Sequence, residues 1–389
     1  MLLRYEFQKV FKNKTVLLCT CLFLLLNAVF ALQSAQKGKD VIFYKNGRTE
    51  ALVQSLDGTL TKEKVDFVSS EYERLASSVA AGTFSTEYDE NTYSGYTYGD
   101  YNLFSLLKEE LDRIYLYPET LETAMQNLEN NAQLYASVGN SYQARQSEKI
   151  RALYGARQIT AFHDYSGLEA YFSYDISYLF VLLSVVVLLS GLFVQEKEFG
   201  MASLLNTTAK GNRPVLYSKV CAGFLLTLLY AFLFFFEDFC VFTACFGSLH
   251  FDVPLYFLPD YAYTVFNGSA GVFALCLGLM KTLGAFCVAA VCMTISKWSK
   301  TYLKSVGASA IFLLALVFFA QLKNDLVVNP VFLARAQTMF LKPSYVGVFG
   351  LQLSLPVAVL LWNAVILFVF IGLLCFKLRE KHARVFRRS

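Results

Sequence analysis

Six stretches of about 20 predominantly apolar residues constrain this chain more than any other feature of its sequence. A helix of that length crosses the hydrocarbon core of a bilayer and satisfies its own backbone hydrogen bonds there. The composition agrees, because 56% of the 389 residues are hydrophobic and 16% are charged, against about a quarter charged in soluble domains. We therefore predict an all-α membrane protein, which excludes a disordered chain or a cytosolic enzyme. The predicted spans are 15–32, 174–194, 215–236 or 215–246, 271–296, 303–322 and 355–376.

The N-terminal region combines two signals. Residues 1–14 place Phe7, Val10 and Phe11 at helical spacing, which predicts an amphipathic helix at the membrane interface rather than a plain cytoplasmic tail. The first span, 15–32, also follows basic residues, as a signal peptide does. Because its apolar core is long and no small-x-small cleavage site follows cleanly, we favour a retained span over a cleaved signal.

Basic residues are concentrated on one side of the predicted spans. With the N-terminus inside, the inner segments hold 17 basic and four acidic residues, whereas segment 33–173 holds 13 basic and 20 acidic ones. The positive-inside rule then places both termini in the cytoplasm. Segment 33–173 becomes an extracytoplasmic domain, and 174–389 carries spans two to six.

The outer segment has the apolar periodicity of helices at 61–81, at 102–138 with a break near Pro118, and at 141–160. It is long enough to form a mainly helical domain. A tyrosine-rich loop separates the first two helices and contains Tyr93, Tyr96 and Tyr98. These rings either contact a cargo or pack on their own helices.

The sequence lacks the usual signatures of catalysis. It has no phosphate-binding P-loop, no H-E-x-x-H zinc motif and no G-x-S-x-G nucleophile motif. Its three histidines, His163, His250 and His382, are scattered along the chain, and its nine cysteines lie in or beside spans. We therefore expect no catalytic residues, no metal, no cofactor, no disulfide framework and no nucleic-acid partner.

Three ionisable residues interrupt the apolar spans. Glu237 and Asp238 stand near the end of the third span, and Lys281 stands inside the fourth. Charges in lipid are costly, so we expect Lys281 to pair with one of the two acids. The alternative is that the third span ends near Phe236, which leaves both acids at the outer interface.

The inner loop after the second span, 195–214, is the most specific feature. It reads as a short helix that begins with acidic residues, carries two adjacent leucines and ends in a Gly-x-Arg turn. Such a rigid piece with an apolar patch suits contact with a cytoplasmic partner better than a solvated connector. Its key residues are Glu196, Glu198, Gly200, Leu204, Leu205, Gly211 and Arg213.

This loop resembles that of the membrane subunits of type-2 ABC exporters. The likeness extends to the N-terminal stretch 2–9, the six spans, the outer domain and the short inner turn 296–300. It implies a permease subunit, paired with a second copy or a sister permease, that exports cargo while separate ATPase subunits bind and hydrolyse ATP. The loop would be the coupling helix that docks on the ATPase, and 329–356 would be an outer re-entrant segment with a short helix beginning at Asn329-Pro330.

The cargo class favoured by the outer tyrosines is a peptide or an amphiphile. A non-transporting receptor or scaffold, with an outer ligand-binding domain, is the alternative and predicts that the inner loop is dispensable. An ion-coupled secondary carrier would need an inverted repeat and more midplane charges, and we find neither signal in the sequence.

Overall fold

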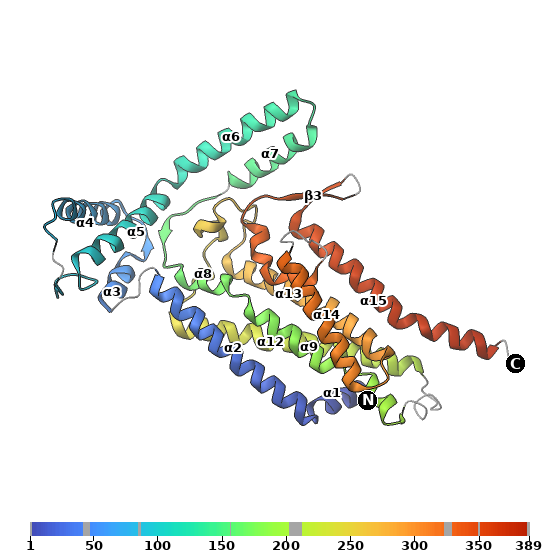
Figure 1. The fold of residues 1–389 in the computed structure, drawn as a ribbon. Coiled ribbons are helices and arrows are strands. Elements are labelled where there is room, and N and C mark those ends of the chain that lie inside the picture. Colours follow the sequence, from blue (N-terminus) through green and yellow to red (C-terminus); the bar gives the residue numbers. More distant parts are fainter. Residues whose placement is uncertain are drawn as a thin grey trace. The chain divides into compact units, whose positions relative to one another are not determined.

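The computed structural model describes residues 2–41, 47–84, 87–155, 157–201, 212–322, 329–348 and 351–386, and most of them are helical (Figure 1). Six helical stretches in this part of the chain are long and apolar enough to cross a membrane. This confirms the prediction of a multi-pass helical membrane protein. The stretches are Lys14–Gly38, Ser166–Glu198, Pro214–Phe246, Ala270–Trp298, Tyr302–Leu322 and Leu355–Cys375.

The chain divides into two compact units. The first contains residues 1–32, 172–244 and 273–389. Its helices are α1 (Leu2–Phe11), α2 (Lys14–Val41), α9 (Ile176–Leu189), α10 (Val194–Glu198), α12 (Asn212–Phe246), α13 (Ala270–Trp298), α14 (Tyr302–Leu322) and α15 (Leu355–Phe386).

Helix α9 is the centre of this unit. It is apolar on all sides, as expected of a helix surrounded by others, and Tyr178, Val181 and Val185 have no exposed surface. Helices α14 and α15, at the periphery of this unit, instead present large apolar side chains. Leu303 is 81% exposed and Phe368 is 76% exposed. Such surfaces are stable only against an apolar environment, which agrees with lipid around this unit.

The second unit contains residues 33–171 and 245–272. It holds α3 (Gly47–Leu56), α4 (Lys62–Ala80), α5 (Thr97–Tyr115), α6 (Tyr117–Ser137), α7 (Ser141–Tyr154) and most of α8 (Ser166–Ser173), together with the short antiparallel pair β1 (Gly58–Thr59) and β2 (Ala161–Phe162). Helices α4 and α5 pack together, as do α6 and α7 (Figure 1).

Local sequence signals explain the helix boundaries in the second unit. The Thr61 side chain accepts a hydrogen bond from the Lys64 backbone N–H and begins α4, and the Asn140 side chain begins α7 in the same way through Gln143. The predicted break near Pro118 is confirmed, because Pro118 lies in the first turn of α6, where its missing N–H costs nothing. Helix α7 ends at Tyr154, earlier than the sequence suggested.

Segment 245–272, which lies between the third and fourth apolar stretches, belongs to this unit. The buried Arg157 guanidinium holds it by donating to the Ala262 carbonyl (3.1 Å) and to Asn267 Oδ1 (3.0 Å). The same guanidinium lies over the rings of Tyr154 and Tyr256, at 4.1 and 4.7 Å from their centroids. One buried cation therefore joins two segments about 100 residues apart in sequence.

The segment before the last apolar helix contains the short helix that the resemblance implied. It is the 3-10 helix η3 (Pro330–Phe340), kinked at Arg335, and the Asn329 side chain begins it by accepting from the Val331 N–H at 3.0 Å. An antiparallel hairpin follows, formed by β3 (Tyr345–Val348) and β4 (Leu351–Ser354). The sequence analysis did not predict these strands.

Candidate functional site

The connector after the second apolar stretch is described from α10 to Met201. Glu196 and Glu198 lie in α10, and Gly200 ends it with a φ of +70°, a conformation that glycine adopts without strain. Three further predicted residues, Leu204, Leu205 and Gly211, lie outside the described residues, as does the side chain of Arg213.

Lys219 of α12 is the centre of a buried ion network behind this connector. Its Nζ lies 3.1 Å from Glu6 Oε1 of α1 and 2.6 Å from Glu196 Oε1 of α10, and it donates to the Leu192 carbonyl at 2.9 Å. Lys219 is 1% and Glu6 is 4% exposed. All three ammonium donors are therefore used, and one cation joins the first helix, the connector and the third-span helix.

Lys9 adds a second cation to this network. Its Nζ lies 3.5 Å from Glu196 Oε1. Burial lowers the pKa of Lys9 from its ordinary value, and the neighbouring Lys219 lowers this pKa further. The amphipathic helix predicted for residues 1–14 has its apolar residues on one face, which leaves Glu6 and Lys9 on its other faces. The structure instead turns both toward the protein, because the buried Lys219 provides a counterion for the carboxylates.

Ser296 holds the start of the connector against the end of α13. Its Oγ accepts from the Phe193 and Val194 N–H groups, at 3.1 and 3.3 Å, and donates to the Ser190 carbonyl at 2.8 Å. This hydroxyl therefore satisfies backbone groups where α9 gives way to α10, a place where helical hydrogen bonds are lacking.

The inner turn between α13 and α14 holds the rest of α10. Glu198 Oε2 accepts from the Tyr302 N–H at 3.2 Å, and Lys197 donates to the Ser299 carbonyl at 3.2 Å. The connector is thus tied to α1, α12, α13 and α14. Helix α10 is therefore packed into the first unit through these contacts.

The connector also exposes apolar side chains. Phe199 is 78% exposed and Met201 is 45% exposed, directly after α10. An exposed phenylalanine on an anchored segment favours contact with another molecule, because burying it would remove its apolar surface from water.

A second polar cluster lies among the apolar helices. Asn27 of α2 donates from Nδ2 to Glu237 Oε2 and to Asp238 Oδ1, both at 2.9 Å, and accepts from the Tyr174 hydroxyl at 2.9 Å. Asn27 is fully buried and Asp238 is 5% exposed. Helix α12 continues to Phe246, so both acids lie within a continuous helix rather than at its end.

Lys281 has a different partner from the one expected. Its Nζ lies 3.7 Å from Asp175 Oδ1, and Asp175 Oδ1 also accepts from Gln337 Nε2 of η3 at 2.8 Å. Within the described chain, neither Glu237 nor Asp238 forms an ion pair with Lys281. The sequence analysis did not consider Asp175, which lies near the start of the predicted span 174–194 and directly before α9.

The three predicted cargo tyrosines lie at the start of α5, with Tyr93 and Tyr96 before it and Tyr98 in its first turn. Tyr96 and Tyr98 are 48% and 52% exposed, whereas Tyr93 packs edge-on against Phe104 at 5.6 Å between ring centroids. The loop is held by Asp100, whose carboxylate accepts from the backbone N–H groups of Tyr93 and Ser94 at 2.9 and 2.6 Å. The structure therefore contains one packed ring and two exposed rings, and a contact of these tyrosines with cargo stays a prediction.

His163 and His250, which are far apart in the sequence, are neighbours in the fold. The rings of His163 and His250 stack with their centroids 4.8 Å apart, and His163 Nδ1 lies 2.9 Å from Asp57 Oδ1. The scattered positions of the histidines were the reason for expecting no metal-binding cluster. The packing of segment 245–272 on residues 33–171 within the second unit removes that reason.

Sequence reasoning missed Asn27, Asp175 and the central place of Lys219. Asn27 had a detectable signal, since a polar residue in the middle of an apolar span requires a partner. Lys219 was counted only as a flanking charge, although it lies inside the described third-span helix. Comparisons with protein-family models, with curated proteins and with solved structures give no match for this chain.

Proposed function

We propose that this chain is the permease subunit of an ATP-driven exporter of the ABC type, in a plasma membrane and with both termini in the cytoplasm. The observation that carries the proposal is the connector around α10. It is tied to four helices by Lys219, Ser296 and Glu198 and presents the exposed Phe199 to a partner. The six apolar helical stretches supply the membrane part.

The anchoring of the connector suits the transmission of force from an ATPase. A flexible loop would absorb a push by changing its own conformation, whereas a segment hydrogen-bonded to several helices passes the displacement on to them. Here a movement of α10 changes the Lys219 contacts with Glu6 and Glu196 at once. The connector therefore links a docking surface to the packing of α1 and α12.

The proposal assigns the chemistry of ATP to other subunits. The permease pairs with a second copy or with a sister permease, and separate ABC ATPase subunits bind and hydrolyse ATP, so this chain carries no catalytic residue for that reaction. Export of a peptide or an amphiphile is the favoured activity, and the exposed Tyr96 and Tyr98 of the second unit offer it aromatic contacts.

The test is gentle affinity purification of the tagged chain from its native membranes, with identification of co-purifying proteins and an ATPase assay. We expect a stoichiometric ATPase subunit with the unaltered chain and with Phe199→Leu, which keeps the apolar contact. Phe199→Asp should lower the yield of this subunit at least about tenfold, since burying an unpaired carboxylate costs more than 1.4 kcal/mol. Isolation of the chain without an ATPase in several mild detergents would refute the proposal and favour the receptor or scaffold.

A further inference from the structure

The second unit contains a cluster of metal-ligating side chains that the proposed function does not use. Asp57, His163 and His250 each offer one ligand atom, and these atoms all lie within 4.8 Å of one another. We propose that these three side chains bind a divalent transition-metal ion, and that the ion is zinc. The inference is independent of the export function.

The backbone brings the three residues together from distant parts of the chain. The antiparallel pairing of Gly58 with Phe162 continues by one residue and places Asp57 opposite His163. His250 comes from segment 245–272, and its φ of +45° is the single positive value among the described non-glycine residues. A histidine held in this conformation costs about 1 kcal/mol or more, and such strain persists only where the surroundings fix it.

The distances suit a small ion with nitrogen and oxygen ligands. Zinc binds imidazole nitrogen and carboxylate oxygen at about 2.0–2.2 Å, so its tetrahedral ligands lie about 3.4 Å apart. His163 Nδ1 and Asp57 Oδ1 are 2.9 Å apart, slightly closer than that separation. The three ligand atoms lie within 4.8 Å of one another, so side-chain rotations would have to bring them to the spacing that zinc requires. The rings of His163 and His250 are stacked with their centroids 4.8 Å apart.

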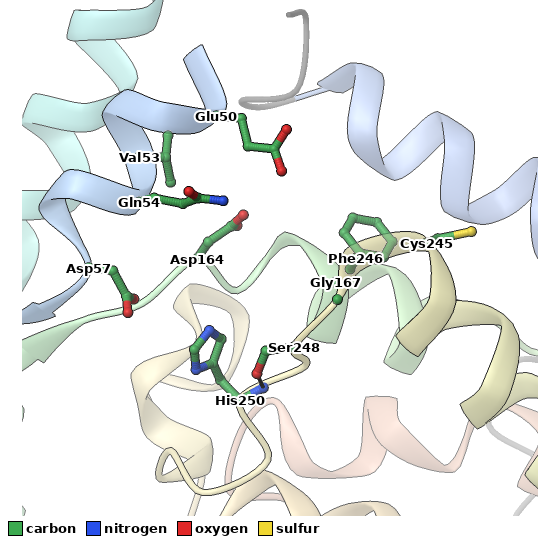
Figure 2. A pocket seen from close by; sticks show the side chains of 11 residues that line it. Glu50, Val53, Gln54, Asp57, Asp164, Gly167, Cys245, Phe246, Ser248 and His250 are labelled. Carbon is green, nitrogen blue, oxygen red and sulfur yellow. Dashed lines mark hydrogen bonds between the residues drawn. The ribbon is translucent and has the colours of Figure 1, made fainter. Parts of the chain in front are cut away.

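The surroundings of the cluster favour a cation. A pocket of about 350 Å³ adjoins it and is lined by the carboxylates of Glu50, Asp57 and Asp164, with no lysine or arginine among the described lining residues. Figure 2 shows Asp57 at the end of α3 and His250 on the loop after α12, both at this pocket, with Glu50 and Gln54 on α3. Negative potential in a partly enclosed site raises the local concentration of cations.

Three protein ligands leave one coordination position for water or another ligand, which is the arrangement of exchangeable and catalytic zinc rather than of closed structural sites. Two histidines and one carboxylate favour zinc over calcium or magnesium, which prefer oxygen ligands alone. Asp57 and His250 also line the adjoining pocket of about 350 Å³, which has room for a small molecule. The site therefore suits reversible zinc binding.

The test uses the full chain in lipid nanodiscs with a tag that contains no histidine. After metal removal, equilibrium dialysis against zinc should load about one zinc per chain, measured by elemental analysis. The double variant His163→Gln/His250→Asn should bind zinc at least about tenfold more weakly, because loss of even an outer-shell partner produces that effect. Asparagine tolerates a positive φ better than most residues, which is why it is chosen to replace His250, and His382→Gln is the matched control.

Equal zinc binding by the double variant and the control would overturn the site, as would no zinc bound by the unaltered chain. If the double variant does not fold, as judged by gel filtration and circular dichroism, cobalt replaces zinc in the unaltered chain. A visible spectrum of tetrahedral cobalt with nitrogen and oxygen ligands supports the proposal. A thiolate-to-cobalt charge-transfer band would place the ion on cysteines and overturn it.

Discussion

Replacing Lys219 by methionine tests the ion network behind the connector most directly. The substitution keeps the length of the side chain and removes the ammonium, which touches the carboxylates of Glu6 and Glu196 at 3.1 and 2.6 Å. Glu196 keeps Lys9 at 3.5 Å, whereas Glu6, 4% exposed, keeps no other cation within 4 Å among the described residues. Removing one partner of a buried ion pair costs about 3–5 kcal/mol, because the remaining charge is buried without compensation.

We therefore expect Lys219→Met to lower the free energy of unfolding by about 3–5 kcal/mol. Adding Glu6→Gln removes the uncompensated charge and should recover about 2 kcal/mol, within the range of coupling energies for contacting residues. Unfolding in mixed micelles, titrated with a denaturing detergent and followed by circular dichroism, measures both values. Lys304→Met is the matched control, because Lys304 is exposed and should change stability by less than about 0.5 kcal/mol.

This reasoning is refuted if the effects of the two substitutions on the free energy of unfolding are additive. If the double variant is destabilised by the sum of the two single effects, within about 0.5 kcal/mol, Lys219 and Glu6 do not interact energetically. The loss seen in Lys219→Met would then come from the other contacts of the ammonium, with Glu196 and the Leu192 carbonyl.

Two further predictions concern the polar groups among the apolar helices and use the same unfolding assay. Lys281→Met should destabilise by about 3 kcal/mol and should be partly rescued by Asp175→Asn but not by Glu237→Gln; rescue by the latter alone would restore the pairing expected from sequence. Asn27→Leu should cost about 1–3 kcal/mol, since two carboxylates lose their amide donor, and an unchanged stability would show that water replaces the amide.

The sequence predicted the apolar helices closely because hydropathy is a local property that a window of residues records. The third stretch ends at Phe246 in the structure, which agrees with the longer predicted span, 215–246. Glu237 and Asp238 interrupt its apolar pattern but not its helix. Helix caps are local as well, because the side chains of Thr61 and Asn140 accept hydrogen bonds from backbone groups three residues further along the chain.

Long-range pairings could not be predicted in the same way. The Lys219 ammonium meets a carboxylate more than 200 residues away, and His163 meets Asp57 and His250 only because β1 pairs with β2 and segment 245–272 packs on the second unit. No periodicity or spacing in the sequence records these contacts. Charges in apolar surroundings signal that partners exist, and only the fold identifies them.

Charged rather than apolar side chains fill the space behind the connector, and there is a physical reason for this. A buried ion pair contributes little net stability compared with well-packed apolar side chains, because desolvation offsets its attraction. What the Lys219 ammonium adds is direction, since its three donors meet Glu6, Glu196 and the Leu192 carbonyl only in one relative arrangement of α1, α10 and α12. Apolar side chains form no directional bonds and would allow α10 to shift relative to α1 and α12. In the proposed function, a partner that presses on Phe199 would have to move all three acceptors together, so the network favours a connector that turns with the helices it joins.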